Sequence, residues 1–461
     1  MLGKRKHVHF IGIGGIGMSG IAEVLINLGF EITGSDLKST AVTRHLESLG
    51  AKIWKGHRKE NVSESDVVVV SSAVSPSNPE VVEAGRRNIP IIPRSDMLGE
   101  LMTIREGIAI AGAHGKTTTT SIAAEVVSRA GMDPTVVVGG KVKALKANAR
   151  LGKGKFIIAE VDESDGYFVR LSPVIAMITN IDREHIDCYG SIENIYEAFI
   201  TFAGRVPFHG AVICCIDNSH VRTIIPKIDR RVITFGLSED ADVRGVIKEY
   251  SEEGTSFTLY INGERRGDLF INLPGRYNVL NALGVCALSE EIGINFEALK
   301  KGLLKFQGVG RRFEFKGETG GILFLDDYAH HPTEIQSVID TARKNFSRRI
   351  VAVFQPHRYT RTRDLYSEFS TCFSKADQVF ITDVYAAGEE ALPGVSGELI
   401  YRVVMRNNTG TVDYLPDRRD LKSSVSDFIK EGDLVLTLGA GDIWRLGEEI
   451  LKEKRLEYEK K

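Results

Sequence analysis

The sequence has few cysteines, almost no net charge and no long apolar run. Its five cysteines are scattered along 461 residues without a CxxC pair, which favours a reducing compartment over a disulfide-stapled fold. The 59 Lys and Arg nearly balance the 61 Asp and Glu, so neither a strongly basic nucleic-acid binder nor an acidic disordered tail is indicated. No window of about 20 residues is apolar enough to span a bilayer.

The N-terminus superficially resembles a secretory signal. Lys4–Lys6 precedes an apolar stretch from Val8 to Ile26, but that stretch holds a cluster of glycines and carries Glu23. A strand, a turn and a helix account for it better than a signal peptide does. Together with the lack of a membrane-spanning run, this predicts a cytoplasmic protein.

Length and periodicity predict an α/β protein of three domains. At about 150 residues per domain, 461 residues correspond to about three domains. Short apolar runs alternate with amphipathic stretches, which is the pattern of βαβ units around parallel sheets. We expect a Rossmann-like N-terminal domain at 1–105, a central P-loop ATPase-like domain with a mixed sheet at 106–312, and a Rossmann-like C-terminal domain at 313–461.

Local patterns predict a hairpin in the central domain and a helix in the last one. Period-two alternation on both sides of Asn262-Gly263 indicates two strands joined by a tight turn whose central residues both need positive φ. In the C-terminal domain, Leu365–Lys375 is predicted to form a helix. Adjacent Cys214 and Cys215 fall in an apolar strand and are expected to be core residues.

A first glycine motif follows a predicted strand and opens a helix. Gly12–Gly17 reads GIGGIG, an arrangement that lets the backbone approach a diphosphate at a helix N-terminus. Asp36, after the next predicted strand, lies where an acid can hold a ribose hydroxyl. The loop specifies a diphosphate and does not specify nicotinamide. A glycine turn needed only for strand–helix packing is the structural alternative.

A second glycine motif predicts a second phosphate site. Gly112–Thr118 reads GAHGKTT and departs from the strict P-loop pattern, because Ile110 stands where that pattern has its first glycine. Backbone N–H groups can still hold phosphates there, Lys116 can reach the β and γ oxygens, and a Thr hydroxyl can ligate Mg²⁺. Two phosphate loops imply two phosphorylated ligands, and a simple dehydrogenase has no use for the second.

Acidic and histidine side chains end the next two predicted strands. Glu160–Asp165 follows a strand beside the second glycine motif, where carboxylates hold the Mg²⁺ of a nucleotide. A solvated acidic loop is the alternative for some of these acids. Thr179–His185 ends the following strand, and His185 is either a metal ligand or a structural histidine.

In their order along the chain, these motifs resemble those of the Mur ligase family of ATP-dependent amide-bond-forming enzymes. The resemblance runs from residue 8 to about 445, and it is specific as an ordered set although no single motif is. It is strongest to the members that act on UDP-N-acetylmuramate and L-alanine. The matching segments are Gly12–Ser19, Gly112–Thr118, Glu160, Asn180–Tyr189, Tyr277–Asn281, Gly308–Phe313, Asp326–Thr333 and His357–Thr362.

The resemblance implies one ligand for each domain, and Tyr277 departs from it by standing where the family commonly has His. The implied UDP-sugar contacts are Gly12, Gly14, Gly15, Gly17, Asp36 and His57. The implied ATP contacts are Gly112, Ala113, His114, Gly115, Lys116, Thr117, Thr118, Asn278, Asn281 and Arg312. The implied amino-acid contacts are Tyr328, His330, Arg358 and Arg361, and the implied Mg²⁺ ligands are Thr117, Glu160 and His185.

The implied reaction is ATP-driven ligation of L-alanine to the lactyl carboxylate of UDP-N-acetylmuramate through an acyl phosphate, in peptidoglycan synthesis. The implied catalytic residues are Lys116, Glu160, His185, Arg312 and His330. Lys116, Arg312 and Mg²⁺ would stabilise phosphoryl charge, and His330 or a nearby carboxylate would accept the proton of the amine. Nucleic-acid and membrane partners are not expected, and the protein is expected to be a monomer or a homodimer.

Three alternatives remain at this point. A sister ligase would attach a preformed peptide or a later amino acid. An NAD-dependent oxidoreductase would account for Gly12–Gly17 and Asp36 but not for Gly112–Thr118. A nucleotide switch or assembly protein would use the second glycine motif without ligation.

Overall fold

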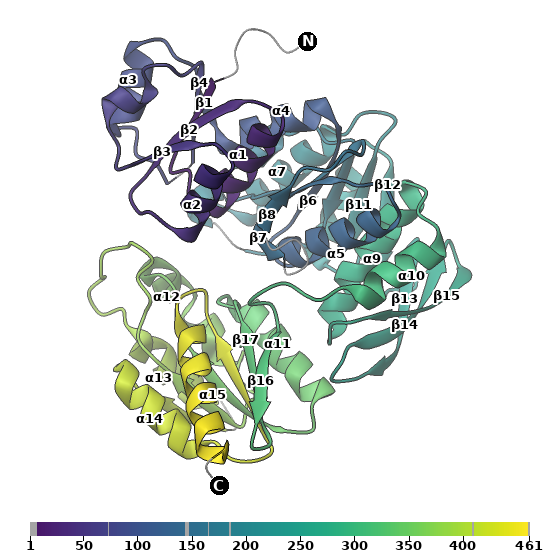
Figure 1. Ribbon diagram of the computed structural model, residues 1–461. Helices are drawn as coiled ribbons and strands as arrows, with labels where there is room; N and C mark the ends of the chain where they lie inside the picture. Colours follow the sequence, from purple (N-terminus) through teal and green to yellow (C-terminus); the bar gives the residue numbers. More distant parts are fainter. Residues whose placement is uncertain are drawn as a thin grey trace. The chain divides into compact units, whose positions relative to one another are not determined.

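The strands form three sheets, one in each predicted domain (Figure 1). The computed structural model describes residues 7–71, 73–142, 147–164, 166–183, 186–407 and 410–459. Parallel strands dominate all three sheets and helices connect them, so the predicted three-domain α/β fold is confirmed. None of the helices in this described part combines the length and apolar character that a membrane crossing demands.

The first sheet is parallel, with the order β3-β2-β1-β4-β5. The strand order reverses between β1 and β4, and open α/β sheets bind ligands at the carboxyl ends of strands at such a point. Its elements are β1 (His7–Ile11), α1 (Ile16–Asn27), β2 (Glu31–Asp36), α2 (Ala41–Ser48), β3 (Lys52–Lys55), η1 (Lys59–Val62), β4 (Val67–Val70), α3 (Pro79–Arg86), β5 (Ile91–Pro93) and α4 (Arg94–Ile104).

The second sheet has ten strands in the order β15-β14-β13-β12-β11-β10-β6-β9-β7-β8. Asn262 (φ 50°) and Gly263 (φ 82°) join β14 to β15, which confirms the predicted hairpin turn. Cys214 and Cys215 are buried in β11, as predicted. The first elements are β6 (Glu106–Ala111), α5 (Lys116–Arg129), β7 (Thr135–Val142), β8 (Ala147–Arg150), β9 (Phe156–Glu160), η2 (Tyr167–Arg170), β10 (Ile175–Ile178), α6 (Ile186–Tyr189), α7 (Ile192–Gly204) and β11 (Ala211–Cys215). The remaining elements are α8 (Ser219–Ile224), η3 (Ile225–Lys227), β12 (Val232–Gly236), β13 (Val243–Tyr250), β14 (Thr255–Ile261), β15 (Glu264–Ile271), α9 (Arg276–Glu291) and α10 (Phe296–Lys305).

The third sheet has the order β16-β17-β21-β18-β19-β20 and is parallel except for β16. Its central strands β17, β21 and β18 are almost completely buried, as apolar strands covered on both faces should be. The elements are β16 (Glu314–Thr319), β17 (Ile322–Asp327), α11 (Pro332–Asn345), β18 (Arg349–Phe354), α12 (Tyr359–Leu365), η4 (Glu368–Ser370), β19 (Gln378–Ile381), α13 (Gly397–Asn407), β20 (Thr411–Tyr414), α14 (Arg418–Phe428), β21 (Asp433–Leu438) and α15 (Ile443–Glu459).

The first two sheets share one hydrophobic core, so these two domains form one compact unit and the third domain forms most of a second. Helix α1 packs against β7 and β8, and buried residues such as Val24 of α1 and Val137 of β7 belong to the same apolar cluster. The first unit is Met1–Lys248, Ser256–Asn272 and Asn278–Val309, and the second is Glu249–Thr255, Leu273–Tyr277 and Gly310–Lys461.

The predicted helix Leu365–Lys375 is wrong. Helix α12 ends at Leu365, and the chain continues through the short 3₁₀ turn η4 with hydrogen bonds to the third residue back, as from Cys372 N–H to the Phe369 carbonyl. Phe369 and Phe373 pack on Phe354, with ring centroids 5.5 and 5.3 Å away. The apolar spacing that indicated a helix comes instead from consecutive turns that bury these rings.

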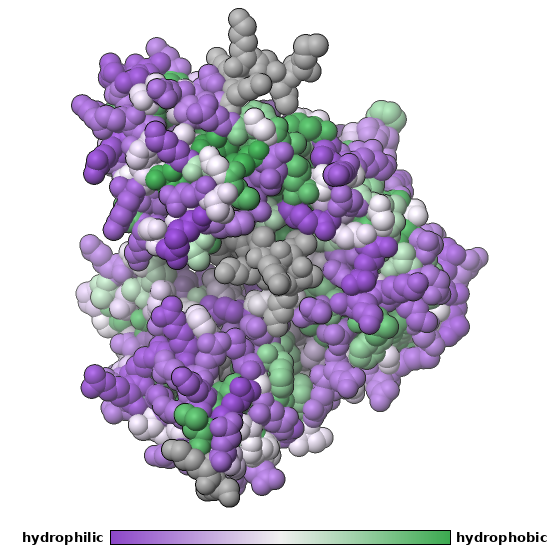
Figure 2. Space-filling model, viewed as in Figure 1, coloured by the Kyte–Doolittle hydropathy of each residue, from purple (hydrophilic) through white to green (hydrophobic). Residues whose placement is uncertain are grey.

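Hydrophilic residues cover most of the face of the molecule shown in Figure 2.

Candidate active site

The first glycine motif forms a tight loop between β1 and α1. Gly12 has φ 78°, a value that favours glycine. The Gly14 N–H donates to Asp36 Oδ2 at 2.9 Å, and a side chain at Gly14 would collide with that carboxylate. A side chain at Gly17 would collide with the Arg94 guanidinium. The glycines therefore let Asp36 and Arg94 approach the loop. In this structure the Asp36 carboxylate supports the loop backbone by accepting from Gly14 N–H.

His57 lies beside the end of β2, with its Nδ1 3.4 Å from the buried carboxylate of Glu80. Its Nδ1 is 2.8 Å from Ser35 Oγ, and Glu80, which is fully buried, accepts a hydrogen bond from the same hydroxyl. Burial opposes ionisation of Glu80, but hydrogen bonds from His9, Ser35 and Asn61 lower its pKa below the ordinary value. No local pattern in the sequence indicated the role of Glu80, because its partners lie far along the chain.

The second glycine motif, Gly112–Thr118, forms the loop between β6 and α5, which is the predicted phosphate loop. Gly112 (φ 135°) and Gly115 (φ 78°) adopt backbone conformations that L side chains rarely take. Asn180 fixes the loop, because its Oδ1 accepts from His114 N–H at 2.7 Å and its Nδ2 donates to the His114 carbonyl at 2.8 Å. A side chain at Gly115 would collide with Asn281, so the predicted ATP contact Asn281 lies directly against the loop. Asn278 lies next to Asn281, because its Oδ1 accepts from Asn281 Nδ2 at 3.4 Å.

Lys116 is held in the loop by backbone carbonyls and by a carboxylate. Its Nζ donates to the Gly112 carbonyl at 2.5 Å and lies 2.9 Å from both oxygens of Glu163. Glu163 is buried, and its own carbonyl accepts from the Tyr189 hydroxyl. The ammonium group is thus positioned where the phosphates of a nucleotide would meet it.

The predicted Mg²⁺ ligands Thr117 and Glu160 lie together. The Thr117 hydroxyl donates to Glu160 Oε1 at 2.8 Å, at the start of α5 and the end of β9. A hydroxyl and a carboxylate are hard oxygen donors of the kind Mg²⁺ takes in nucleotide sites, so these two residues fit that ion. The third predicted ligand, His185, lies outside the described residues, as does Asp165 of the acidic segment.

Two further carboxylates surround the phosphate loop. Asp162 forms an ion pair of 3.1 Å with Arg94. Burial opposes its ionisation, but the positive charges of Arg94 and Lys116 lower the pKa of Asp162 to about 2. Asp182 lies 2.9 Å from His114 Nε2. Asp182 therefore contacts the loop through His114, whereas Asp162 pairs with Arg94 of α4. The sequence predicted a Mg²⁺ role for the acidic segment that contains Asp162 and no role for Asp182.

In the second unit, Tyr328 and His330 follow β17 and lie close to two arginines. The guanidinium groups of Arg311 and Arg312 lie 4.9 and 5.3 Å from the centre of the Tyr328 ring. Arg312 also forms an ion pair of 3.7 Å with Glu334. His330 Nδ1 lies 3.0 Å from the Tyr328 carbonyl, so that nitrogen donates and the neutral ring has its accepting nitrogen at Nε2.

His357, Arg358 and Arg361 form a basic cluster between β18 and α12. The His330 and His357 rings lie 5.8 Å apart, and Arg361 Nη1 is 3.2 Å from His357 Nδ1. Burial, together with the nearby His330, Arg361 and Arg358, lowers the pKa of His357 to about 3, so this ring is neutral. The amino-acid residues predicted from the sequence are therefore brought together around His330.

Arg358 has a backbone conformation that is unusual for a side chain of its size. Its φ is 70° and its ψ 137°, a combination that costs about 1–3 kcal/mol outside glycine. The Arg358 N–H donates to the Tyr385 carbonyl at 2.9 Å, and the Tyr385 ring stacks on His357. Glu389 accepts from the Thr360 hydroxyl at 2.7 Å and lies 3.5 Å from Arg358 Nε. The segment after β19 therefore holds the arginine in place, which the sequence did not predict.

Asp327, the last residue of β17, holds the backbone just before β16 and just after β17. Its two oxygens accept from Phe313 N–H at 2.6 Å and Ala329 N–H at 2.7 Å. Complete burial raises the pKa of Asp327 to about 7, although Arg312 and these two N–H groups oppose the rise. Burial likewise raises the pKa of its neighbour Asp326, which accepts from the Thr437 hydroxyl at 2.7 Å.

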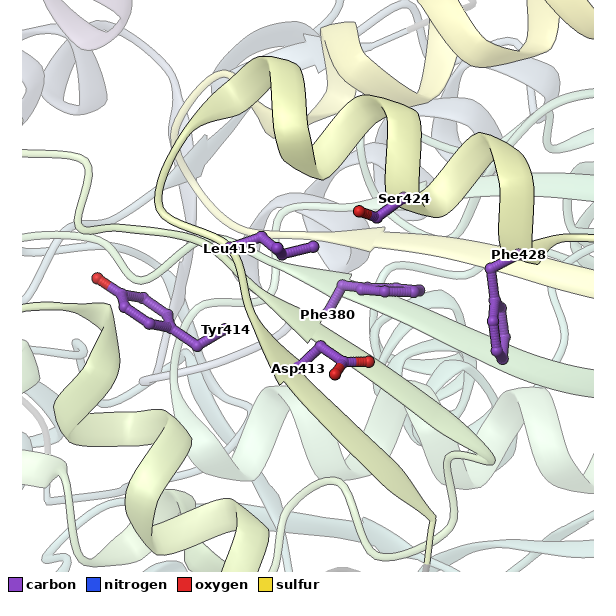
Figure 3. Close-up of a pocket in the computed structure, with 6 residues that line it drawn as sticks. All are labelled: Phe380, Asp413, Tyr414, Leu415, Ser424 and Phe428. Atoms are coloured by element: carbon purple, nitrogen blue, oxygen red, sulfur yellow. The ribbon is translucent and has the colours of Figure 1, made fainter.

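A pocket in the second unit lies between β19, β20 and α14 (Figure 3). The rings of Phe380 and Phe428 meet edge to face at its wall, with centroids 5.6 Å apart. Asp413 lies at its rim and accepts from Gln378 Nε2 at 2.8 Å. None of the residues that the sequence predicted for the site lines it. The lining residues are Phe380, Asp413, Tyr414, Leu415, Ser424 and Phe428.

Two glycine loops, each between a strand and a helix, and a cluster of arginines on a further α/β domain agree with the nucleotide-dependent ligase class that the sequence predicted. The chain belongs to the Mur ligase family. The models of the Mur ligase family catalytic domain, the Mur ligase middle domain and the Mur ligase glutamate ligase domain match residues 7–106, 110–289 and 311–441. This membership leaves no support for the oxidoreductase and nucleotide-switch alternatives.

Several relatives resemble the chain over its whole length. The UDP-N-acetylmuramate–L-alanine ligase of Trichlorobacter lovleyi is 50% identical over 454 residues, which cover 98% of this chain and 100% of the relative. The ligase of the same name from Pelobacter propionicus is 50% identical over 453 residues, which cover 98% of each. The crystal structure of the UDP-N-acetylmuramate–alanine ligase MurC of Thermotoga maritima shares 29% identity with a TM-score of 0.82, covering 98% of this chain and 99% of that one.

Proposed function

We propose that this chain ligates L-alanine to the lactyl carboxylate of UDP-N-acetylmuramate at the expense of ATP, in peptidoglycan synthesis. The observation that carries the proposal is the match at 50% identity, over the whole length, to ligases named for these two substrates. The proposal includes a cytoplasmic location, a monomer or homodimer, and the domain boundaries 1–105, 106–312 and 313–461.

The first proposed step activates the carboxylate. A carboxylate acylates poorly, so its oxygen attacks the γ-phosphorus of ATP and ADP leaves, which gives an acyl phosphate. Lys116 and Arg312 stabilise the charge that builds on the phosphoryl oxygens. Mg²⁺, when bound, withdraws charge from the same oxygens, and Thr117 and Glu160 are suited to hold it, with His185 as the sequence-predicted third ligand.

The second proposed step forms the amide. The amine of alanine attacks the acyl carbon, and the tetrahedral intermediate expels phosphate. Arg358 and Arg361 suit the carboxylate of the amino acid, since guanidinium groups bind carboxylates in bidentate fashion. His330 accepts the proton of the amine at Nε2, because its Nδ1 already donates to the Tyr328 carbonyl at 3.0 Å.

The UDP-sugar belongs to the N-terminal domain in this proposal. Gly12–Gly17 holds the diphosphate at the start of α1, and Asp36 and His57 lie toward the uridine. The support for this assignment is the open glycine loop at the point where the strand order of the first sheet reverses.

Isotope transfer tests the proposed chemistry. With ¹⁸O in both oxygens of the lactyl carboxylate, the released phosphate should carry one ¹⁸O, because that carboxylate oxygen becomes part of the acyl phosphate. Unlabelled phosphate would contradict activation of the carboxylate by phosphoryl transfer.

A further inference from the structure

Glu80 is a buried carboxylate outside the motifs that carry the chemistry. It lies in the first turn of α3, where Asn78 caps the helix, and its side chain is completely buried. A buried carboxylate is stable only when several donors satisfy it. Those donors come from β2, from the turn after β3 and from η1. Glu80 therefore joins these segments to β2, whose Ser35 carbonyl accepts from Gly12 N–H of the glycine loop at 2.8 Å.

The two oxygens of Glu80 have different kinds of partner. Oε1 accepts from Asn61 Nδ2 at 2.5 Å and from Arg58 N–H at 3.2 Å, and both of these groups can only donate. Oε2 accepts from the Ser35 hydroxyl at 2.5 Å, and a hydroxyl can also accept. Oε2 also faces His57 Nδ1 at 3.4 Å and His9 Nε2 at 3.6 Å.

The hydrogen bonds determine which nitrogen of His57 carries the proton. Ser35 has one hydroxyl proton and donates it to Glu80. Ser35 Oγ must therefore accept from His57 Nδ1, which lies 2.8 Å away. A neutral His57 with its proton on Nδ1 has an accepting lone pair at Nε2.

We infer that Glu80 is a positioning residue which, through Ser35, keeps His57 in the tautomer whose Nε2 accepts a hydrogen bond. The inference rests on the proposed binding of the UDP-sugar to this domain. An accepting nitrogen pairs with a donor, such as a ribose hydroxyl or the imide N–H of uracil. Diphosphate oxygens only accept, so the diphosphate is left to the glycine loop, and in the proposed orientation of the UDP-sugar His57 recognises the uridine.

The substitution Glu80→Gln should reverse the direction of the hydrogen bonds that join His57, Ser35 and residue 80. Asn61 and Arg58 require the amide oxygen at the position of Oε1, so the amide NH₂ faces Ser35. Ser35 then accepts from the amide and donates to His57 Nδ1, and the ring proton moves to Nε2. We expect the KM for UDP-N-acetylmuramate to rise about tenfold, as for one lost hydrogen bond, with the KM values for ATP and alanine unchanged.

Two further variants separate this effect from packing. Ser35→Ala removes the hydroxyl but leaves Glu80 Oε2 as an acceptor 3.4 Å from Nδ1, so His57 should keep its proton on Nδ1. Glu83→Gln makes the same chemical change on the same helix, where the side chain pairs with Arg86 and Arg87. It should change neither the tautomer nor the KM for the UDP-sugar.

Nitrogen NMR of ¹⁵N-histidine-labelled full-length protein, with His57 assigned from the spectrum of His57→Gln, reads the tautomer directly. The inference predicts the proton on Nδ1 in the unsubstituted protein and in Ser35→Ala, and on Nε2 in Glu80→Gln. A proton on Nε2 in the unsubstituted protein, or an unchanged ring in Glu80→Gln, overturns it. Failure of UDP-N-acetylmuramate to bind in calorimetry would instead overturn the proposed function, because the NMR result does not depend on that ligand.

Discussion

Lys116 and Glu163 form an ion pair at the phosphate loop, with Nζ 2.9 Å from both carboxylate oxygens. Both side chains are mostly buried, and the ammonium group also contacts the loop carbonyls. Under the proposed function, an incoming nucleotide phosphate would compete with Glu163 for the same charge. We therefore expect the pair to link the stability of the nucleotide-free protein to its affinity for ATP.

Glu163→Gln tests this link. The variant leaves the Lys116 ammonium without its counter-charge, so the free energy of unfolding without nucleotide should fall by about 1–3 kcal/mol. Phosphates restore the missing negative charge, so a non-hydrolysable ATP analogue should raise the melting temperature of the variant more than that of the unsubstituted protein. Equal shifts in thermal melts of the two proteins would show that Glu163 is not the counter-ion of Lys116.

Lys116→Ala should separate ATP chemistry from sugar binding. Removing the ammonium group that stabilises the phosphoryl oxygens should lower ADP formation by about 10²-fold or more. Calorimetry should show UDP-N-acetylmuramate binding within about twofold of normal, since the first glycine loop is a separate site. Lys227→Ala, at an exposed lysine of the same unit, is the matched control. Near-normal turnover of Lys116→Ala would refute the phosphate assignment.

Two substitutions of Arg358 separate the role of its guanidinium group from the effect of its positive φ. Arg358→Ala and Arg358→Gly should both raise the KM for alanine by about tenfold or more and leave the KM for ATP nearly unchanged, because both remove the guanidinium group. Glycine relieves the positive φ of 70°, so the glycine variant should be more stable than the alanine variant by about 1 kcal/mol.

Denaturant unfolding and steady-state kinetics of both Arg358 variants provide the two measurements. Arg363→Ala is the control, since that exposed arginine of the same helix pairs with Asp364. Equal effects of Arg358→Ala on the KM values for alanine and ATP would remove Arg358 from the amino-acid pocket.

The raised pKa of Asp327 predicts that the free energy of unfolding depends on pH. Its pKa rises on folding from about 4 to about 7, so the folded state binds the extra proton between these values. The contribution of Asp327 to the free energy of unfolding is therefore fully present below about pH 4 and is lost as the pH rises to about 7, by up to about 4 kcal/mol.

Asp327→Asn should remove this slope. It should also lower stability at pH 5 by about 1–3 kcal/mol, because its NH₂ group faces a backbone N–H. Urea unfolding from pH 4 to 8 gives the difference curve, with Asp340→Asn as control, since the half-buried Asp340 of α11 pairs with Lys375. A difference curve that is flat across this range would mean that Asp327 is ionised throughout.

The sequence predicted the parts of the site that depend on local chemistry. The two glycine loops and the Asn262-Gly263 turn require backbone conformations that few residues adopt, so their sequences identify them. Thr117 and Glu160 were predicted as Mg²⁺ ligands from the second glycine motif, from the acids that follow the strand beside it, and from the resemblance to the family. The roles assigned to His57, His330 and the arginines stay predictions, as does the metal role of His185.

The supporting carboxylates could not be predicted, because their partners are distant in sequence. Glu80 meets Ser35, 45 residues away, and Glu163 meets Lys116, 47 residues away. A single glutamate within an amphipathic or acidic segment looks the same whether it faces solvent or a buried histidine. The wrong helix at Leu365–Lys375 has a related cause, since apolar spacing alone does not distinguish a helix from a series of turns that bury the same rings.

The most direct test of the proposed function measures ADP formation by the full-length protein with ATP, Mg²⁺ and UDP-N-acetylmuramate, adding each amino acid in turn and a preformed L-alanyl peptide separately. We expect rapid ADP release with L-alanine only when the sugar nucleotide is present, and a product heavier than UDP-N-acetylmuramate by one alanyl residue. ADP release that needs neither co-substrate, or that responds to the peptide and not to L-alanine, would contradict the proposed function.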